Sequence, residues 1–384
     1  PLERAGYRFL RAAGPSDLAR EGARVPWAIL ASSLRAAASA LFSKAGLEER
    51  QAFFRCLKAR LCWSAVHERV RFDHYIYANR EDSSQIALNA AMRRSGTLSW
   101  YYSLFFGGGL ILSRDGDARK HRHVLWAYLN SDRFLGINDE ALAAMKASTQ
   151  AVRRYEAIGS VFSQLVREAA EGFDRESYAQ RVFGRSARGA SIVSFFDTTF
   201  IDSPDCPTTY EDALGFYADI LRFLEDRGDA LVVVKPSKDA AYFTDPAGQW
   251  ASPEKGRRLI ALWERIKTHS RARWAGDAGD TVEIMAASDL VITHCFSSPT
   301  IEALGARRRA LWYEPGEKFR GTYYDRIPGL VAHGYQELSD RSRELTAASE
   351  EEHGRWLDRH VKGALEAHLD GRALTRLRRA LGGA

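Results

Sequence analysis

The stretch from residue 287 to residue 315 constrains the fold of this chain more than any other part of its sequence. Its pattern predicts a buried strand at 290–293, a polar turn at 294–298, a helix at 300–305 and a second apolar strand at 310–313. Apolar strands that alternate with helices are typical of a parallel α/β sheet. In open sheets of this kind ligands bind beyond the carboxyl ends of the strands, so the polar turn is a candidate binding loop.

The residues of this turn are suited to holding an anion. Ser297 and Ser298 fall between the strand and the helix, where free backbone N–H groups and the positive end of the helix dipole favour negative charge. His294 follows the strand, and Thr300 and Glu302 lie on the first turn of the helix, where Glu302 would face a ribose or cap the helix. We expect all five residues to bind a nucleotide. Two plainer explanations stay open: helix capping by the serines and a structural hydrogen bond for His294.

Composition bounds the class of protein. At 384 residues the chain is long enough for two domains with cores of their own. The net charge of +6, from 55 basic and 49 acidic residues, permits an anionic substrate or an anionic membrane surface without demanding either. No basic block with interleaved aromatic residues is present, so nucleic acid is not an expected partner. The four cysteines lack metal-ligand spacing, so we expect a reducing compartment, no metal site and no cofactor.

The sequence also bears on where the protein works. No apolar run reaches the roughly 20 residues of a membrane-spanning helix, and the longest candidate, 100–112, is interrupted by three glycines. We therefore expect a cytoplasmic protein, with at most peripheral contact at the inner face of a bacterial inner membrane. The chain begins with Pro1 rather than methionine, which predicts a processed chain or one module of a multidomain protein.

The first part of the chain combines helical periodicity with strand-like segments, which indicates an α/β layer. The segments expected here are helices at 18–44, 47–69, 85–93 and 139–155, strands at 72–78 and 98–105, and a strand or short helix at 123–129.

Alternation is cleaner in the second part. The segments expected here are strands at 191–196 and 230–235, helices at 210–226, 253–270 and 281–287, and amphipathic helices from 340 to 384. Two Rossmann-like domains that face a cleft account for this order. We expect an N-terminal acceptor-binding domain at 1–180 with a helical start, a C-terminal nucleotide-sugar-binding domain at 185–340, and C-terminal helices at 341–384 that cross back to the first domain.

Three polar loops follow predicted strands of the second part, and one parallel sheet would bring them to the same edge. The first loop begins with Asp197, directly after an apolar strand. The second is the run Lys235, Pro236, Ser237 and Lys238, in which the lysines would neutralise a phosphate and the serine would donate a hydrogen bond to it. The third contains the serine pair of the polar turn.

These three loops, in this order, resemble bacterial transferases that use CMP-activated acidic sugars. They are the sialyltransferase-like and Kdo (3-deoxy-octulosonate) transferase families of capsule and lipopolysaccharide synthesis, in which an acidic motif precedes a His-Pro or Lys-Pro motif and then a Ser-Ser or Ser-Thr motif. The resemblance covers about residues 190 to 316. It implies the GT-B architecture, a CMP-activated donor, most of all CMP-Kdo, and a glycan or glycolipid acceptor. Lys235 stands where many of these enzymes have histidine, and lysine is a poor proton donor.

The resemblance also implies a chemistry. A CMP-activated ulosonate releases CMP directly, so no divalent ion is needed at a pyrophosphate. Asp197 would act either as the base that activates an acceptor hydroxyl, with inversion, or as a nucleophile that forms a glycosyl-enzyme adduct, with retention. The resemblance to retaining Kdo transferases favours the nucleophile. Glu81 and Asp82 would then handle the acceptor proton, although their segment equally fits the start of a helix.

Other functions fit the same pattern. A GT-B enzyme that uses a UDP- or GDP-sugar, or a CDP-polyol phosphotransferase, would place serines and a glutamate similarly. A nucleotide-sugar 2-epimerase would need further acid and base groups in the cleft, for which His294 is the only placed histidine. A non-catalytic glycan- or nucleotide-binding module is the remaining alternative.

Overall fold

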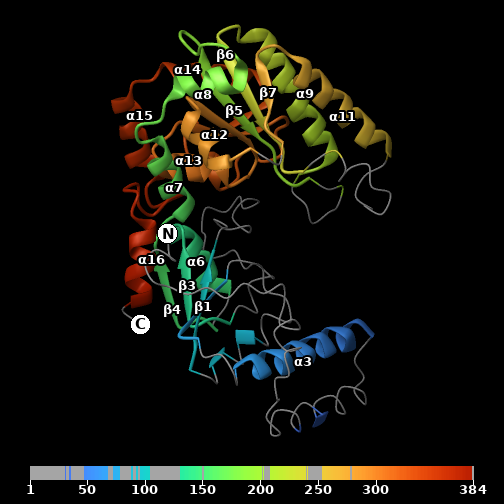
Figure 1. Cartoon of the computed structure of the whole chain (residues 1–384), viewed down its shortest axis with the longest axis vertical. Helices are drawn as coiled ribbons and strands as arrows, with labels where there is room; N and C mark the ends of the chain where they lie inside the picture. The colour runs from blue at the N-terminus through green and yellow to red at the C-terminus, as the bar shows by residue number, and fades with distance from the viewer. Residues whose placement is uncertain are drawn as a thin grey trace. The chain divides into compact units, whose positions relative to one another are not determined.

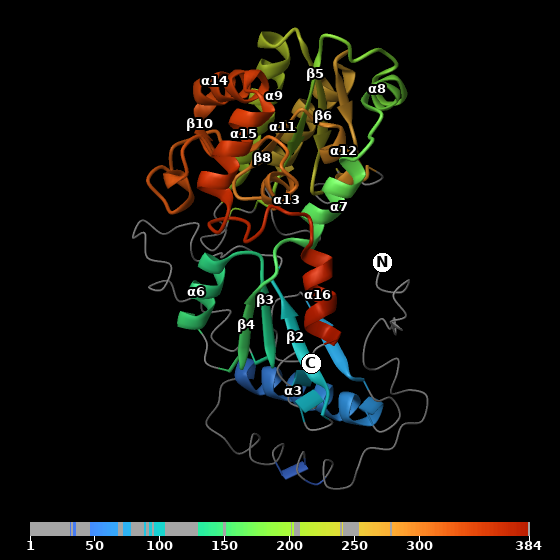
Figure 2. The same ribbon diagram turned by 90° about the vertical axis from the view of Figure 1, so that its left-hand side faces the viewer.

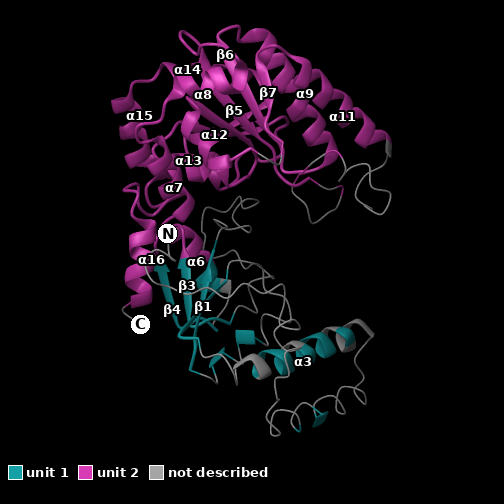
Figure 3. Cartoon of the chain, in the orientation of Figure 1, with its two compact units in different colours: residues 1–103, 122–135, 145–156 teal, residues 104–121, 136–144, 157–384 magenta. Residues whose placement is uncertain are grey.

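The fold is described from a computed structural model of the chain (Figure 1). The residues whose structure is described are 31, 34–35, 47–67, 72–77, 88–89, 92–93, 96–103, 130–148, 151–200, 202, 208–238, 240, 253–276 and 279–382. The chain forms two compact units that interleave along the sequence (Figure 3). Unit 1 comprises 1–103, 122–135 and 145–156, and unit 2 comprises 104–121, 136–144 and 157–384. The predicted division at 180–185 stays a prediction.

Most of a four-stranded sheet belongs to unit 1, in the order β1-β2-β3-β4. Its strands are β1 (His74–Tyr77), β2 (Leu98–Tyr102), β3 (Arg133–Gly136) and β4 (Arg154–Ala157). Strand β2 pairs in parallel with β1 and with β3. The buried side chains of Trp100, Tyr101 and Phe134 form its core. Helix α3 (Leu47–His67) precedes the sheet in the chain.

One helix of this part is shorter than predicted. The periodicity predicts a helix at 139–155, but α6 (Asp139–Ser148) ends seven residues earlier and β4 follows. Ser148 and Thr149 have low helix propensity. Beyond them the backbone joins the sheet instead, since the Arg154 N–H donates to the Asp132 carbonyl. Pairing with a neighbouring strand thus outweighs a local helical pattern.

Unit 2 contains a six-stranded sheet whose strand pairs are all parallel, in the order β10-β9-β8-β5-β6-β7. Its strands are β5 (Ser191–Phe196), β6 (Ala230–Lys235), β7 (Ala272–Trp274), β8 (Leu290–His294), β9 (Ala310–Glu314) and β10 (Val331–His333). From β5 the chain moves outward to β7 and then returns to the other side of β5 with β8. The strand order therefore reverses between β5 and β8, which makes this pair the topological switch point of a Rossmann-like sheet.

Helices cover both faces of this sheet (Figures 1 and 2). One face carries α9 (Tyr210–Asp226), α11 (Pro253–Thr268) and α14 (Gly334–Ala347), and the other carries α7 (Val161–Ala170), α12 (Thr281–Ala287) and α13 (Pro299–Gly305). The other helical segments among the described residues of unit 2 are α8 (Arg175–Phe183), a 3-10 turn (Tyr324–Arg326), α15 (Glu350–Trp356), a π-helical turn (Leu357–Val361) and α16 (Ala373–Gly382). Within the described ranges, no helix has both the length and the apolar content to cross a membrane.

Aromatic side chains dominate the core on the α9 face. Phe195 of β5 makes edge-to-face contacts with Phe216 and Phe223, and Tyr217 packs against Trp263 of α11. All five are buried. Truncation of such a residue to alanine typically costs about 3–5 kcal/mol, so this cluster holds the strand ends of the switch point on a rigid base. The predicted α/β fold with Rossmann-like parallel sheets is confirmed.

Candidate functional site

Five polar residues gather at the carboxyl edge of the six-stranded sheet because each stands at or just after the end of a parallel strand. Asp197 follows β5, Lys235 ends β6, His294 ends β8, Glu314 ends β9 and His333 ends β10. Neighbouring strands end in register, since Lys235 pairs with the last residue of β5 and His333 pairs with Glu314. Three of these five residues were predicted from the sequence. Glu314 and His333 were not.

Asp197 is a buried carboxylate, 4% exposed, that links three elements. Its Oδ2 accepts a hydrogen bond of 2.7 Å from the Tyr217 hydroxyl on α9, and its Oδ1 accepts one from the Ser237 backbone N–H after β6. Burial raises the pKa of Asp197 to about 6, although both hydrogen bonds and the nearby Lys235 charge oppose the rise. Both oxygens thus have protein partners, and the carboxylate joins the loops after β5 and β6 to α9.

The loop after β6 adds positive charge beside Asp197. Lys235 is half-buried, and its Nζ lies 3.4 Å from the Pro236 carbonyl oxygen. Ser237 is exposed, and its hydroxyl lies 3.4 Å from the Thr198 carbonyl oxygen. Lys238 is half-buried. The structure therefore brings this predicted loop to the Asp197 carboxylate through Ser237.

His294 occupies the other side of the switch point. Its ring is 1% exposed and stacks on Phe216, with centroids 4.9 Å apart and an interplanar angle of 12°. Burial lowers the pKa of His294 to about 4, so the ring is neutral at physiological pH. Its Nδ1 is buried and has no hydrogen-bond partner among the residues whose structure is described. Buried polar atoms are usually paired in native proteins, so this nitrogen is open to a hydrogen bond from a water molecule or a ligand.

The serine pair lies in the turn between β8 and α13. Both Ser297 and Ser298 are half-buried. The Ser298 side chain does not bond a backbone N–H of α13, so the alternative that this serine caps the helix through its hydroxyl is wrong. The hydroxyl instead bonds to Glu302, whose pKa is raised by burial and lowered in part by this bond. The Ser297 carbonyl accepts a hydrogen bond of 2.9 Å from the Trp312 indole, which fixes the turn to β9.

Thr300 faces the sheet rather than its edge. Its hydroxyl is fully buried, lies 2.6 Å from the Thr293 hydroxyl and donates to the Leu311 carbonyl at 3.0 Å. A hydroxyl engaged in this way joins α13 to β8 and β9. The predicted nucleotide contact by this residue has no support in the geometry, because the first turn of α13 points its threonine inward.

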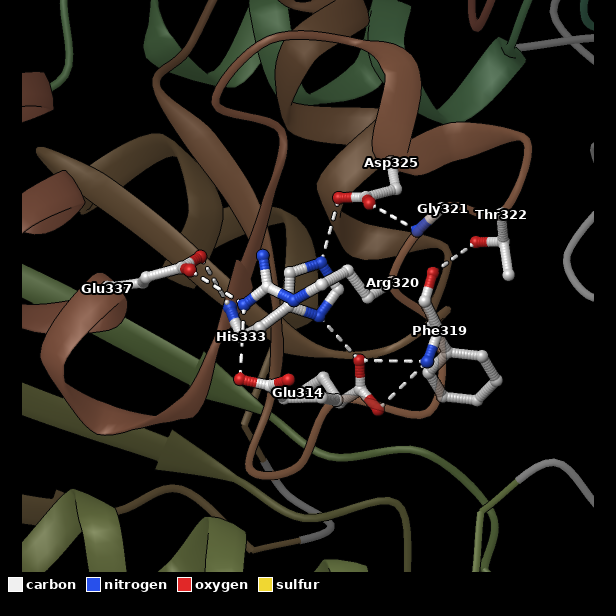
Figure 4. A network of polar contacts seen from close by, with 9 residues as sticks. Glu314, Phe319, Arg320, Gly321, Thr322, Asp325, His333 and Glu337 are labelled. Carbon is white, nitrogen blue, oxygen red and sulfur yellow. Dashed lines mark hydrogen bonds and ion pairs between the residues drawn. The ribbon is translucent and has the colours of Figure 1, made fainter. Parts of the chain in front are cut away.

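A buried ion network joins the ends of β9 and β10 (Figure 4). The His333 ring lies between two carboxylates, with Nδ1 2.7 Å from Glu314 Oε2 and Nε2 2.8 Å from Asp325 Oδ1. Burial favours the neutral ring, but the two carboxylates outweigh it and raise the pKa of His333. The Glu314 carboxylate also accepts the Phe319 N–H, at 3.1 Å. Sequence reasoning missed this network, although Glu314 directly follows a predicted strand.

The same network holds the loop that follows β9. Asp325 accepts the Gly321 N–H at 2.6 Å, and Glu337 accepts the His333 N–H at 3.1 Å while it pairs with Arg320 at 2.8 Å (Figure 4). Residues 315–326 are thus tied at several points to the carboxyl edge of the sheet.

The loop after β9 also brings a cation to the switch point. Lys318 pairs with Asp212 on the first turn of α9, where Asp212 forms a capping box with Thr209. Burial alone would raise the pKa of Asp212, but Lys318 and the Thr209 hydrogen bonds lower it below its usual value. The charges of Lys318 and Asp212 both act on His294. A fourth loop therefore joins the three predicted ones at this edge.

The predicted acceptor-side residues Glu81 and Asp82 lie outside the described residues. Within the part of the chain that is described, no group of three or more His, Cys, Asp or Glu side chains is arranged to hold a metal ion.

Solved structures with a similar fold are GT-B proteins. The wall teichoic acid polymerase TagF aligns with a TM-score of 0.52 at 11% identity, over 89% of this chain and 77% of that one. The UDP-GlcNAc 2-epimerase of Neisseria meningitidis aligns with a TM-score of 0.52 at 10% identity, over 88% and 83%. The UDP-forming trehalose-phosphate synthase of Burkholderia xenovorans aligns with a TM-score of 0.51 at 13% identity, over 89% and 81%. These likenesses show the fold.

Sequence comparison shows the family. No curated protein sequence matches the chain. Residues 37–341, which are most of the chain, match the family model described as "Polysaccharide biosynthesis PFTS motif protein". The chain therefore belongs to the family of polysaccharide biosynthesis PFTS motif proteins.

Proposed function

We propose that this protein is a glycosyltransferase of polysaccharide synthesis that binds a nucleotide-activated donor at the carboxyl edge of the unit 2 sheet. The observation that carries the proposal is His294 at the switch point between β5 and β8, a neutral buried ring whose Nδ1 has no partner among the described residues. The Lys318 charge acts on this ring, and Lys235, which is expected to neutralise a phosphate, ends strand β6 at the same edge of the sheet. The family to which the chain belongs supports a role in polysaccharide synthesis.

The donor is the finer part of the proposal. The order of Asp197, the Lys235–Lys238 loop and the serine pair supports a CMP-activated ulosonate such as CMP-Kdo. The ligands of similar structures support a second candidate, a CDP- or UDP-linked donor. One TagF structure was soaked with CDPG, and the epimerase structure holds UDP-GlcNAc. Since these proteins share only the fold with this chain, their ligands indicate which nucleotides to test first.

The contacts of Asp197 favour a positioning role over the nucleophilic one predicted from the sequence. A nucleophile must reach the anomeric carbon, whereas Asp197 is 4% exposed and its oxygens are held by hydrogen bonds from Tyr217 and Ser237. We propose that Asp197 holds the β6 loop in place, so that Lys235 and Lys238 meet the donor phosphate. Glu81 and Asp82 remain the proposed groups for the acceptor proton.

Nucleotide binding tests the proposal directly. Thermal unfolding of the whole chain is measured with CMP, CDP, UDP and GDP, first without metal and then with Mg²⁺. A nucleotide at 100 times its dissociation constant stabilises the native state by about 2.7 kcal/mol. A shift that is largest with CMP and independent of Mg²⁺ supports the ulosonate donor, and a shift that is largest with CDP or UDP supports the second candidate. Failure of all four nucleotides to shift the transition overturns the proposal.

A variant connects the binding to His294. His294→Phe keeps an aromatic ring against Phe216 but removes both nitrogens, so we expect the nucleotide shift to be lost while the fold persists. The matched control is His269→Phe, because His269 lies just after α11 at the opposite edge of the sheet. An equal shift in the wild type and in His294→Phe contradicts the assignment of this residue.

A further inference from the structure

A pocket lies away from the carboxyl edge of the sheet, where the donor site is proposed. It has a volume of about 200 Å³ and lies between residues 328–329, the second half of α14 and helix α15. Residues 328–329 directly precede β10, so the pocket belongs to the amino edge of the sheet. The proposed donor site occupies the carboxyl edge. The pocket is therefore separate from that site and can be occupied independently of it.

An indole ring forms the largest apolar surface of this pocket. Trp356 is half-buried and lines the pocket together with Leu345. Its Nε1–H donates to the Pro328 carbonyl at 2.9 Å, and its ring stacks beside His353, with centroids 6.0 Å apart and an interplanar angle of 16°. The indole is thus held in one orientation with its polar atom already bonded. The indole therefore presents an apolar ring face to a bound molecule.

Charged groups surround this surface with donors and acceptors. Arg341 Nη1 lies 2.8 Å from Glu344 Oε2, and this pair lines the pocket from α14. Glu352 lines it from α15, where its carboxylate accepts the Ser349 N–H at 2.9 Å as part of a capping box. A carboxylate has about four lone-pair sites, so these bonds leave acceptor capacity on both glutamates.

His353 is the buried polar member of the lining. It is 3% exposed, and burial, helped by the Arg309 charge, lowers its pKa to about 4. The neutral ring bonds to the Arg308 backbone, and its Nε2 has no partner among the described residues. A neutral imidazole that donates through one nitrogen is an acceptor at the other. The buried Nε2 is therefore a hydrogen-bond acceptor.

From these features we infer that the pocket binds a neutral sugar unit. A pyranose presents C–H groups on one face, which suit the fixed indole, and a ring of hydroxyls that donate to Glu344 and Glu352. Two carboxylates against one guanidinium disfavour phosphate and other anions. The volume is below the range of roughly 300–1,000 Å³ that is typical of drug-sized ligands, which fits a single sugar residue. The inference does not rest on the proposed donor site.

The test uses the whole chain and four probes: methyl glucoside, methyl N-acetylglucosaminide, glycerol and inorganic phosphate. Saturation-transfer NMR detects binding, and calorimetric titration measures its affinity. We expect at least one glycoside to bind and phosphate neither to bind nor to compete. Glu344→Gln should weaken binding by about tenfold, since the sugar hydroxyl then meets a neutral acceptor in place of a charged one. The matched control, Glu351→Gln, alters an exposed glutamate of α15 that does not line the pocket, and it should leave the affinity unchanged.

A second variant guards against a folding artefact. Trp356→Ala should abolish glycoside binding, while Trp356→Phe keeps an aromatic face and should retain part of it. Absence of glycoside binding in the wild type overturns the inference. An affinity that is unchanged in both Glu344→Gln and Trp356→Phe overturns it as well. Competition by phosphate also overturns it. Nucleotide-induced thermal shifts should be the same in all these variants, which separates this site from the donor site.

Discussion

The Tyr217 hydroxyl lies 2.7 Å from Oδ2 of Asp197 and donates a hydrogen bond to it, so a residue of helix α9 holds the carboxylate that follows strand β5. The other carboxylate oxygen accepts the Ser237 N–H. Helix α9, the end of strand β5 and the loop after β6 are thereby joined through the buried Asp197 carboxylate. A substitution of Tyr217 should therefore change nucleotide affinity as well as the free energy of unfolding.

Tyr217→Phe removes this donor and keeps the ring. We expect the free energy of unfolding to fall by about 1–3 kcal/mol, because a buried carboxylate loses a hydrogen bond. Nucleotide affinity should fall too, since the β6 loop loses part of its anchor. Chemical denaturation and calorimetric titration measure the two effects. Tyr335→Phe is the control: it removes a hydroxyl–carboxylate bond of the same length, to Asp226 at the end of α9, without involving Asp197. Equal loss of affinity in both variants would contradict the link.

Asp197 should make stability depend on pH. Burial raises its pKa from 3.8 to about 6, so its contribution to stability is fully present below pH 3.8 and is lost as pH rises through about 6. A shift of this size corresponds to roughly 3 kcal/mol, as an order of magnitude. Asp197→Asn stays neutral at every pH. The difference in unfolding free energy between wild type and variant, measured from pH 4 to pH 7, should therefore move in favour of the variant. A difference that is flat across this range contradicts the raised pKa.

The contribution of the buried His333 to the free energy of unfolding should also depend on pH. The carboxylates of Glu314 and Asp325 raise its pKa above 6.5, so its stabilisation is complete below pH 6.5 and is lost as pH rises through the higher folded-state value. His333→Gln leaves Glu314 buried without its cation, for which we expect a loss of about 3–5 kcal/mol at pH 6. Urea denaturation at pH 6 and pH 9 measures it, and the loss should be smaller at pH 9.

His353 provides the control for that experiment. Burial lowers its pKa to about 4, so its contribution is lost as pH falls from 6.5 toward 4, the opposite sign to His333. The difference in the free energy of unfolding between His353→Gln and wild type should therefore be smallest at low pH. If the loss of unfolding free energy followed the same pH trend in His333→Gln and His353→Gln, the assignment of a charged His333 would be wrong.

Packing between α13 and α7 leaves no room for a side chain at Gly305. A Cβ built there would lie 2.2 Å from the Ser163 hydroxyl oxygen and 2.7 Å from the Ser163 Cβ. Gly305→Ala should therefore lower stability by about 1–3 kcal/mol, as overpacking typically does. Adding Ser163→Gly removes both clashing atoms and should restore part of the loss, which a double-mutant cycle in denaturant measures. Additive losses would show that the two residues do not collide.

Much of the six-stranded sheet could be predicted from the sequence. The strands at 191–196 and 230–235 and the helix at 210–226 coincide with β5, β6 and α9. The two strands are predominantly apolar and are bounded by the polar residues Asp197 and Lys235, and the helix shows a helical period. Strands β7 and β10 were missed because three residues carry no periodic signal.

The sequence by itself determined that apolar strands alternate with helices and that Asp197, Lys235 and His294 stand at strand ends, because period and position are local properties of the chain. Only the tertiary structure decided what these side chains meet. Tyr217 lies 20 residues from Asp197 and Asp325 lies eight from His333, and neither pairing follows from a local pattern. Strand order, helix packing and burial bring such groups together and set their protonation, and these are properties of the folded chain.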